Sequence, residues 1–366
     1  MMRLQKITAL ALAAALAVSL AACGGAADSA PAASAAPAAS EAAGEAAPAP
    51  VEEENAAETA YPLTLTDQAG REVTIASEPE TLVSGYYIST SLLIALGLED
   101  QLAGIEAKAD TRPIYARSAP ELLELPSVGT AKAFDLEGCL ALEPDLVVLP
   151  LKLEESADAL AELGVPALVV NPEDQALLNE AALLLGRATN TSARAEALLA
   201  FAAAQEARLD EALAGLADAD RPVVYLAGNS DFLRTAGDGM YQADLLRMAG
   251  AKNAAAGLTD SYWADVSYEQ VLAWDPDVIL LASDADYTVE EVLNDPALAG
   301  CKAVENGRVL QMPGDAEAWD SPVPGGILGA VWLASALHPE ECPEAEAMEV
   351  IDSFYETFYD FSYSAG

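Results

Sequence analysis

The residues best suited to chemistry in this sequence are a few cations that stand out in an acidic chain. The 366 residues include 17 lysines and arginines against 59 aspartates and glutamates. Four cations (Lys108, Arg112, Arg117 and Lys132) fall between positions 108 and 132, and Arg234 stands in a comparable loop of the second half. Cations bind anionic ligands through charge-assisted hydrogen bonds. We therefore expect these loops to form an anion-binding site.

Aromatic residues are interleaved with these cations, and rings can stack on a flat ligand or face a cation. Together the two residue types favour a bulky, planar anion, and a ferric catecholate siderophore fits that description. The predicted ligand-binding residues are Tyr86, Tyr87, Arg112, Arg117, Lys132, Arg234, Tyr262, Trp263 and Trp319. The alternatives are a surface ion pair for each cation and half-buried packing for each ring.

The composition excludes several other functions. A net charge of −42 argues against binding to nucleic acid, whose phosphates require lysine and arginine. The sequence has neither a Gly-x-Ser-x-Gly motif nor a phosphate-binding glycine loop, and His338 is its one histidine. We therefore expect a binding protein rather than an enzyme, with a surface sensor or adhesin as the other alternative.

Histidine and cysteine are also too scarce for a metal cage, so we predict no metal site and no cofactor. Iron would enter only as part of the ligand. His338 precedes a proline at a predicted helix end, which indicates a structural role. Cys139 falls on a predicted buried helix face, and Cys301 and Cys342 could form a disulfide in an exported protein.

The element that must position these loops occurs twice. Residues 136–149 and 268–281 share a helix pattern, a Pro-Asp pair and an apolar run. Proline ends the helix, and an unbroken apolar run is typical of a strand that is covered on both faces. The duplication predicts two similar α/β lobes with a ligand cleft between them.

Helix and strand patterns alternate on either side of an Ala- and Leu-rich segment, which indicates parallel sheets. We predict a Rossmann-like N-terminal lobe at 61–173, connector helices at 174–218 and a second Rossmann-like lobe at 219–366. The longer connector helix, at 192–216, should be a rigid link. Ligands of such sheets bind at the carboxyl ends of the strands.

The N-terminus has the pattern of an export signal at residues 1–22: two cations, an apolar run and small residues. The sequence Leu-Ala-Ala-Cys at 20–23 resembles the lipobox of bacterial lipoproteins, in which the cysteine is lipidated. We therefore predict that Cys23 anchors the protein outside the cytoplasm. Residues 23–60, rich in Ala, Pro and Glu, are predicted to be a disordered tether.

Taken together, these features resemble the class III substrate-binding proteins of ABC importers, which carry ferric siderophores, haem or cobalamin. The matching segments are residues 63–75, Val128-Gly129, both repeat copies and residues 319–322. The resemblance implies two lobes joined by a long helix, and a permease and its ATPase as partners of a monomer. It leaves haem, a corrinoid and a molybdate-type oxyanion as alternatives to the siderophore.

In that family one glutamate on each lobe docks onto the permease. The matching residues are Glu137 and Glu269, which occupy the same position in the two repeat copies. Helical periodicity places each beside an inward-facing residue but on the solvent side. An acid in the first turn of a helix also interacts favourably with the helix dipole, so a purely structural role is the alternative.

Overall fold

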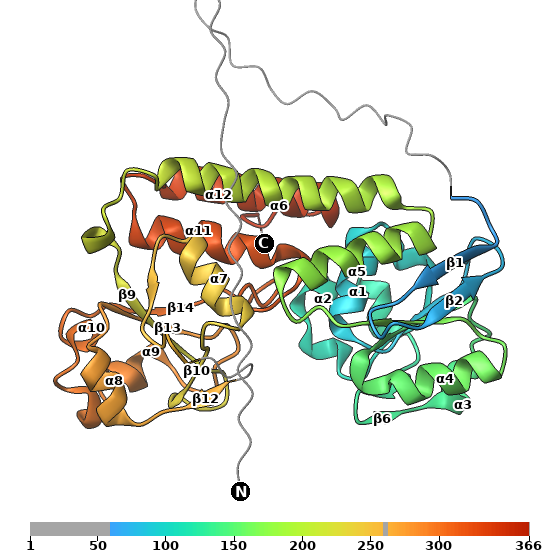
Figure 1. The fold of residues 1–366 in the computed structure, drawn as a ribbon, viewed down its shortest axis with the longest axis horizontal. Helices are drawn as coiled ribbons and strands as arrows, with labels where there is room; N and C mark the ends of the chain where they lie inside the picture. Colours follow the sequence, from blue (N-terminus) through green and yellow to red (C-terminus); the bar gives the residue numbers. More distant parts are fainter. Residues whose placement is uncertain (1–58, 259–262, 366) are drawn as a thin grey trace, which may run out of the picture. The chain divides into compact units, whose positions relative to one another are not determined.

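The computed structural model describes residues 59–258 and 263–365 (Figure 1). The predicted signal peptide, Cys23 and nearly all of the predicted tether lie outside these ranges, as does Tyr262. Each half of the described chain contains a sheet flanked by helices, as predicted. Among the described residues, no helix is both long and apolar enough to cross a membrane.

The first lobe is built on a four-stranded parallel sheet with the strand order β4-β3-β7-β8. Two antiparallel hairpins, β1-β2 and β5-β6, accompany it. The strands are β1 (Leu63–Thr66), β2 (Glu72–Ile75), β3 (Leu82–Ser84), β4 (Leu102–Gly104), β5 (Gly129–Thr130), β6 (Ala133–Phe134), β7 (Leu146–Pro150) and β8 (Ala167–Val170). The helices are α1 (Tyr87–Ala95), α2 (Pro113–Ser118), α3 (Leu136–Leu140) and α4 (Glu154–Glu162).

The second lobe has a six-stranded sheet that is parallel at its centre and antiparallel at one edge. The strands are β9 (Val223–Ala227), β10 (Arg234–Thr235), β11 (Lys252–Asn253), β12 (Ala264–Asp265), β13 (Val278–Leu281) and β14 (Val309–Gln311). The helices are α7 (Tyr241–Met248), α8 (Tyr268–Trp274), α9 (Val289–Leu293) and α10 (Lys302–Glu305). Strand β10 runs antiparallel to both of its neighbours, β9 and β12, because the chain reverses tightly after β9. The sequence did not predict this antiparallel edge.

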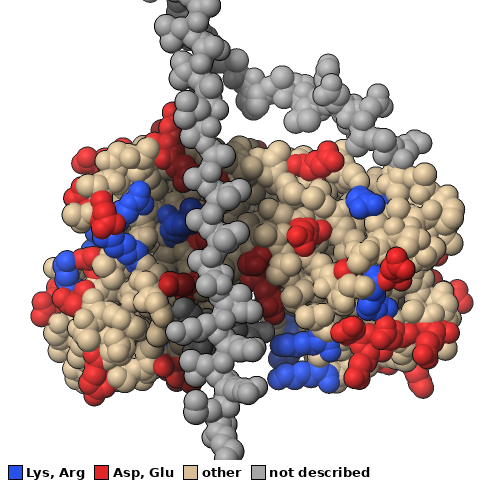
Figure 2. Space-filling model, viewed as in Figure 1, with Lys and Arg blue, Asp and Glu red and all other residues tan. Residues whose placement is uncertain are grey.

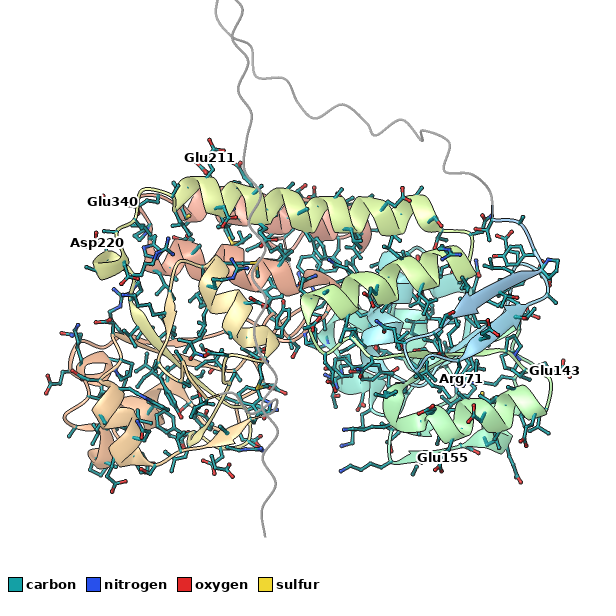
Figure 3. The ribbon with its side chains drawn as sticks, in the orientation of Figure 1. Arg71, Glu143, Glu155, Glu211, Asp220 and Glu340 are labelled. Carbon is teal, nitrogen blue, oxygen red and sulfur yellow. The ribbon has the colours of Figure 1, made fainter. Side chains whose placement is uncertain are left out.

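The predicted repeat extends to the backbone conformation. Helices α3 and α8 each lead to a strand, β7 or β13, that is buried along its whole length. Glu143 and Asp275, which precede the two prolines, both have a positive φ, of 51° and 45°. Glu143 lies at the outer edge of its lobe (Figure 3). A left-handed residue at a helix end is a common way to stop a helix, and Asp275 caps α8 in this way. Helix α3 ends earlier, at Leu140, so the two copies share the turn before the proline but not the helix end.

The two lobes are joined by helices α5 (Gln175–Ala188) and α6 (Ser192–Ala212), with α11 (Ile327–Leu337) and α12 (Glu344–Phe358) packed beside α6 (Figure 1). Glu211, near the end of α6, and Glu340, after α11, lie at the same end of this layer (Figure 3). The ring of Phe201 in α6 contacts Phe354 and Phe358 in α12, at centroid distances of 5.3 and 6.0 Å. The connector is therefore a packed helical layer, and α6 ends four residues before the predicted position 216.

The three cysteines within the described ranges are buried and free. Cys139 lies in the core as predicted. Cys301 and Cys342 belong to different apolar clusters, so they form no disulfide. His338 ends α11, is buried and has its Nε2 3.3 Å from the main-chain oxygen of Gly250, in agreement with a structural role.

Candidate functional site

Two adjoining cavities lie where the carboxyl ends of the strands of both lobes face each other. The smaller has a volume of about 140 Å³ and the larger about 510 Å³. Four residues line both cavities: Tyr87, Arg112, Asp284 and Ala318. The first two stand at the starts of α1 and α2 in the first lobe, and the last two come from loops of the second, so any ligand held here contacts both lobes.

Arg112 occupies the junction of the two cavities. It immediately precedes α2, and its guanidinium carbon lies 4.0 Å from the centre of the Tyr87 ring. The main chain of Arg112 bonds with Ala109 and Tyr115. Within the described part of the chain, its guanidinium forms no ion pair with a carboxylate and donates no hydrogen bond. The half-buried guanidinium is thus held in place by a ring face, which leaves its N–H groups available to an anion.

The loop that faces Arg112 from the second lobe offers main-chain donors. Gly314, Ala316, Glu317 and Ala318 line the smaller cavity, and their N–H groups donate no hydrogen bond within the described residues. A methyl group at Gly314 would lie 3.0 Å from Cβ of Ser283, so this loop approaches the segment after β13 closely. Free backbone N–H groups in a loop are a common means of binding anions.

Several hydroxyl groups that line the smaller cavity already donate to oxygens. Ser91 Oγ donates to Glu317 over 2.5 Å, Ser283 Oγ to Asp320 over 2.6 Å, and Tyr115 OH to Glu106 over 2.7 Å. Thr90 also donates to Glu106, over 2.6 Å. These bonds fix the walls of the cavity but leave the hydroxyl hydrogens unavailable to a ligand.

Three buried carboxylates at the cavities differ from ordinary surface acids. Glu317 and Asp320 line the cavities, and Glu106 lies behind the wall, where it accepts from Tyr115. Burial raises the pKa of Glu106 and of Asp320, although hydrogen bonds to their oxygens partly oppose this shift. Glu317 is only 4% exposed, and burial raises its pKa to about 7. A carboxyl in this state carries a proton for part of the time at neutral pH.

The larger cavity has aromatic walls and several acids. Tyr86, Tyr87, Tyr241 and Trp263 provide the rings, and the Tyr86 and Tyr87 rings meet edge to face at 5.1 Å. Burial raises the pKa of Tyr86 and Tyr87, so their hydroxyl groups keep their protons. The acids that line the cavity are Glu173, Asp174, Asp284 and Asp320, and the one lining cation among the described residues is Arg112.

Of the nine predicted ligand-binding residues, Tyr86, Tyr87, Arg112 and Trp263 line the cleft. Tyr262 lies outside the described residues. The remaining four line neither cavity, which differs from the expectation.

Arg117 pairs with Asp315 at 3.4 Å and donates to the main-chain oxygen of Tyr363. Its guanidinium also lies 4.5 Å from the centre of the Phe361 ring. Arg117 therefore joins the first lobe to the C-terminal segment rather than facing a ligand.

The other three residues also have different surroundings. Arg234 pairs with Asp265 on the neighbouring strand, at 3.2 Å. Trp319 is 1% exposed and donates from Nε1 to the hydroxyl of Tyr355, so it belongs to the core. Lys132 is exposed in the turn between β5 and β6. Figure 2 accordingly shows the lysines and arginines of this face as separate groups rather than a continuous basic surface.

The two predicted docking acids lie in equivalent places. Glu137 is in the first turn of α3, which Asp135 caps, and Glu269 is in the first turn of α8, which Ser267 caps. Both glutamates are exposed. Hydrogen bonds from a main-chain N–H and from Ser267 lower the pKa of Glu269.

Comparison with known proteins places these features in a family. Residues 82–316 match the profile of a periplasmic binding protein family. The chain is 30% identical over 323 residues to the molybdate-binding protein MolA of Haemophilus influenzae, covering 82% of this chain and 91% of that one. The molybdate-bound structure of MolA superimposes with a TM-score of 0.73 at 27% identity, covering 82% of this chain and 99% of that one.

Two further relatives have different descriptions. An uncharacterised ABC transporter substrate-binding lipoprotein of Bacillus subtilis, YvrC, is 25% identical over 78% of this chain and 88% of its own length. A cobalamin-binding protein of Halobacterium salinarum is 26% identical over 67% of this chain and 65% of its own length.

Proposed function

This chain belongs to the periplasmic binding protein family, the solute-binding components of ABC importers, and from that premise we propose that it captures a small oxyanion of the molybdate class. The observation that carries the proposal is Arg112, a guanidinium that forms no ion pair within the described residues and contacts both cavities between the lobes. A fixed, unpaired guanidinium in a half-buried cleft suits an anion, because it can donate two parallel hydrogen bonds.

The second lobe supports the same ligand class. The N–H groups of residues 314 and 316–318 face no acceptor within the described chain, and a cavity of about 140 Å³ is matched to a small ion. Tyr86, Tyr87 and Ile88, at the start of α1, line the adjoining cavity. The positive end of a helix dipole adds an attraction for negative charge. The molybdate-binding relative agrees with this reading.

The ferric siderophore remains a prediction with less support. A ferric catecholate would need several cations in the cleft, but Arg112 is the one cation that lines these two cavities among the described residues. Four carboxylates line the larger cavity. A ferric catecholate carries several negative charges, which these acids would repel. Iron would still enter only as part of such a ligand.

A corrinoid is the second candidate, because the larger cavity has the required walls. Tyr86, Tyr87 and Trp263 could stack on a flat macrocycle, and about 510 Å³ would hold part of one. The carboxylates could accept hydrogen bonds from amide side chains. The cobalamin-binding relative agrees with this alternative.

A titration of the purified protein tests these assignments. Tryptophan fluorescence and calorimetry would be recorded with molybdate, tungstate, sulfate, cobalamin, haem and a ferric catecholate. The proposal expects saturable binding of molybdate and tungstate at micromolar concentration or below. Saturation by cobalamin alone would favour the corrinoid, and saturation by the ferric catecholate or haem alone would overturn the oxyanion proposal.

The remaining proposals concern docking onto the permease and anchoring to the membrane. We propose that Glu137 and Glu269 contact the permease, one from each lobe, because both are exposed at the head of a repeat helix. We also propose that residues 1–22 are removed as a signal and that lipidated Cys23 anchors the protein on the outer side of the membrane. Mass spectrometry of the protein purified from membranes would identify a lipid on Cys23.

A further inference from the structure

Glu317 is a buried carboxyl that the capture of an anion does not by itself explain. Its side chain lines the smaller cavity, and it forms no ion pair within the described residues. Its Oε1 accepts from Ser91 Oγ at 2.5 Å and from Tyr359 OH at 3.2 Å, and its Oε2 accepts from the N–H of Gly325 at 3.1 Å. Ser91 comes from α1 in the first lobe, so the carboxyl links the two lobes beside the proposed anion site.

The groups around Glu317 leave its charge uncompensated. Arg112, Tyr115 and Asp284 line the same cavity, and Tyr241, Tyr355 and Tyr359 come from α7, α12 and the residue after α12. Burial raises the pKa of each of these four tyrosines, so they are neutral. Arg112 is the one cation in the set. A bound oxyanion in the same cavity would repel the Glu317 carboxylate.

We propose that Glu317 is a positioning residue that takes up one proton from solvent when an oxyanion enters the smaller cavity, and that this proton frees the Ser91 hydroxyl for the anion. The proposal rests on the oxyanion function. In the ionised state Ser91 must donate to Glu317, so its hydrogen is not available to a ligand.

Protonation reverses this hydrogen bond. The new O–H on Oε1 donates to Ser91 Oγ, and the Ser91 hydrogen can then turn toward the cavity that Ser91 also lines. Tyr359 keeps an acceptor, because its hydroxyl also lies 3.2 Å from the main-chain oxygen of Ser91. One proton thus removes a repulsive charge and supplies a hydrogen-bond donor.

The pKa of Glu317 fits this role. Because burial raises its pKa to about 7, a bound anion would raise the pKa further, and the carboxyl would gain a proton near neutral pH. Above neutral pH, each further unit should then weaken binding by up to about tenfold, the limit for uptake of one proton.

Calorimetry of molybdate binding in buffers of different ionisation enthalpy tests the proposal, because it counts the protons taken up. We expect close to one proton at about pH 8 and an affinity that falls toward alkaline pH. Glu317→Gln should abolish both the proton uptake and the pH dependence. Ser91→Ala should lower the affinity in the acidic range more than in the alkaline range. Lys132→Gln, outside both cavities, should leave the profile unchanged.

The outcomes separate the two proposals. Binding of molybdate, tungstate or sulfate without proton uptake would overturn the role of Glu317 and leave the oxyanion function standing. Binding of none of the three anions at either pH would overturn the oxyanion function, and this inference with it. If Glu317→Gln does not fold, the number of protons that the unaltered protein takes up on binding still tests the role of Glu317.

Discussion

Replacing Arg112 with glutamine removes the guanidinium from the junction of the two cavities while keeping a polar side chain of similar reach. A hydrogen bond to a charged group contributes about 1.5–3 kcal/mol. Loss of one such bond should therefore weaken oxyanion binding by roughly 10- to 150-fold, and loss of a two-bond contact by more. Arg112→Lys should lie between, because lysine keeps the charge but not the paired N–H groups.

The same substitution should have little effect on folding. Arg112 forms no ion pair within the described residues, and its main contact is the Tyr87 ring at 4.0 Å. Such a cation–π contact contributes about 0.5–1 kcal/mol at a partly exposed site. Urea unfolding should therefore show a loss of about 1 kcal/mol or less, so weaker binding could not be attributed to unfolding.

The assay is calorimetric titration with molybdate, and Lys132→Gln is the matched control. Both substitutions remove one positive charge, but Lys132 is exposed and lines neither cavity. If the two variants lost affinity equally, a general effect of net charge would explain the result. If Arg112→Gln bound molybdate as tightly as the unaltered protein, the assignment of the site would be refuted.

Three further predictions concern docking, the C-terminal segment and pH. Glu137→Ala combined with Glu269→Ala should abolish uptake in a transport assay while ligand affinity stays unchanged, and normal uptake would contradict the docking role. Arg117→Ala should lower the unfolding free energy by about 1–2 kcal/mol, because its ring contact and hydrogen bonds are lost. Urea unfolding measures this loss, with Lys132→Ala as the control. Equal stability of the two variants would argue against the link to the C-terminal segment. Burial raises the pKa of Glu317 to about 7, above its ordinary value, so its contribution to stability is present in acid and is lost as the pH rises through 7. Between pH 4.5 and pH 8 the unfolding free energy of the protein should therefore fall by roughly 3 kcal/mol more than that of Glu317→Gln. Parallel stability curves of the two proteins would exclude the pKa shift.

The architecture was predictable because its signals are local. The apolar runs at 146–150 and 278–281 are buried strands, and Pro144 and Pro276 each stand between a helix and a strand. The antiparallel edge of the second sheet was not predictable, because β10 and β12 contain two residues each. Such short strands leave no recognisable periodicity.

The site was predictable only in part, for a physical reason. Loop position was sufficient to place Tyr86, Tyr87 and Arg112 at the cleft, because the carboxyl ends of parallel strands share one edge. It could not reveal that Arg117 pairs with Asp315, nearly 200 positions away, instead of facing a ligand.

Glu317 carried no signal at all among 59 acidic residues. Its burial arises from helices and loops that converge only in the folded chain, namely α1, the segment around Gly325 and the residues after α12. The main-chain donors of the same loop are equally invisible in a sequence, because every residue except proline has an N–H group.

The most direct test of the oxyanion site is a crystal structure of the protein grown with tungstate, whose anomalous scattering locates the metal without ambiguity. We expect one strong anomalous peak in the smaller cavity, within hydrogen-bonding range of the Arg112 guanidinium and the main chain at 314–318. A peak at another site, or no peak in a crystal grown with saturating tungstate, would refute the oxyanion site.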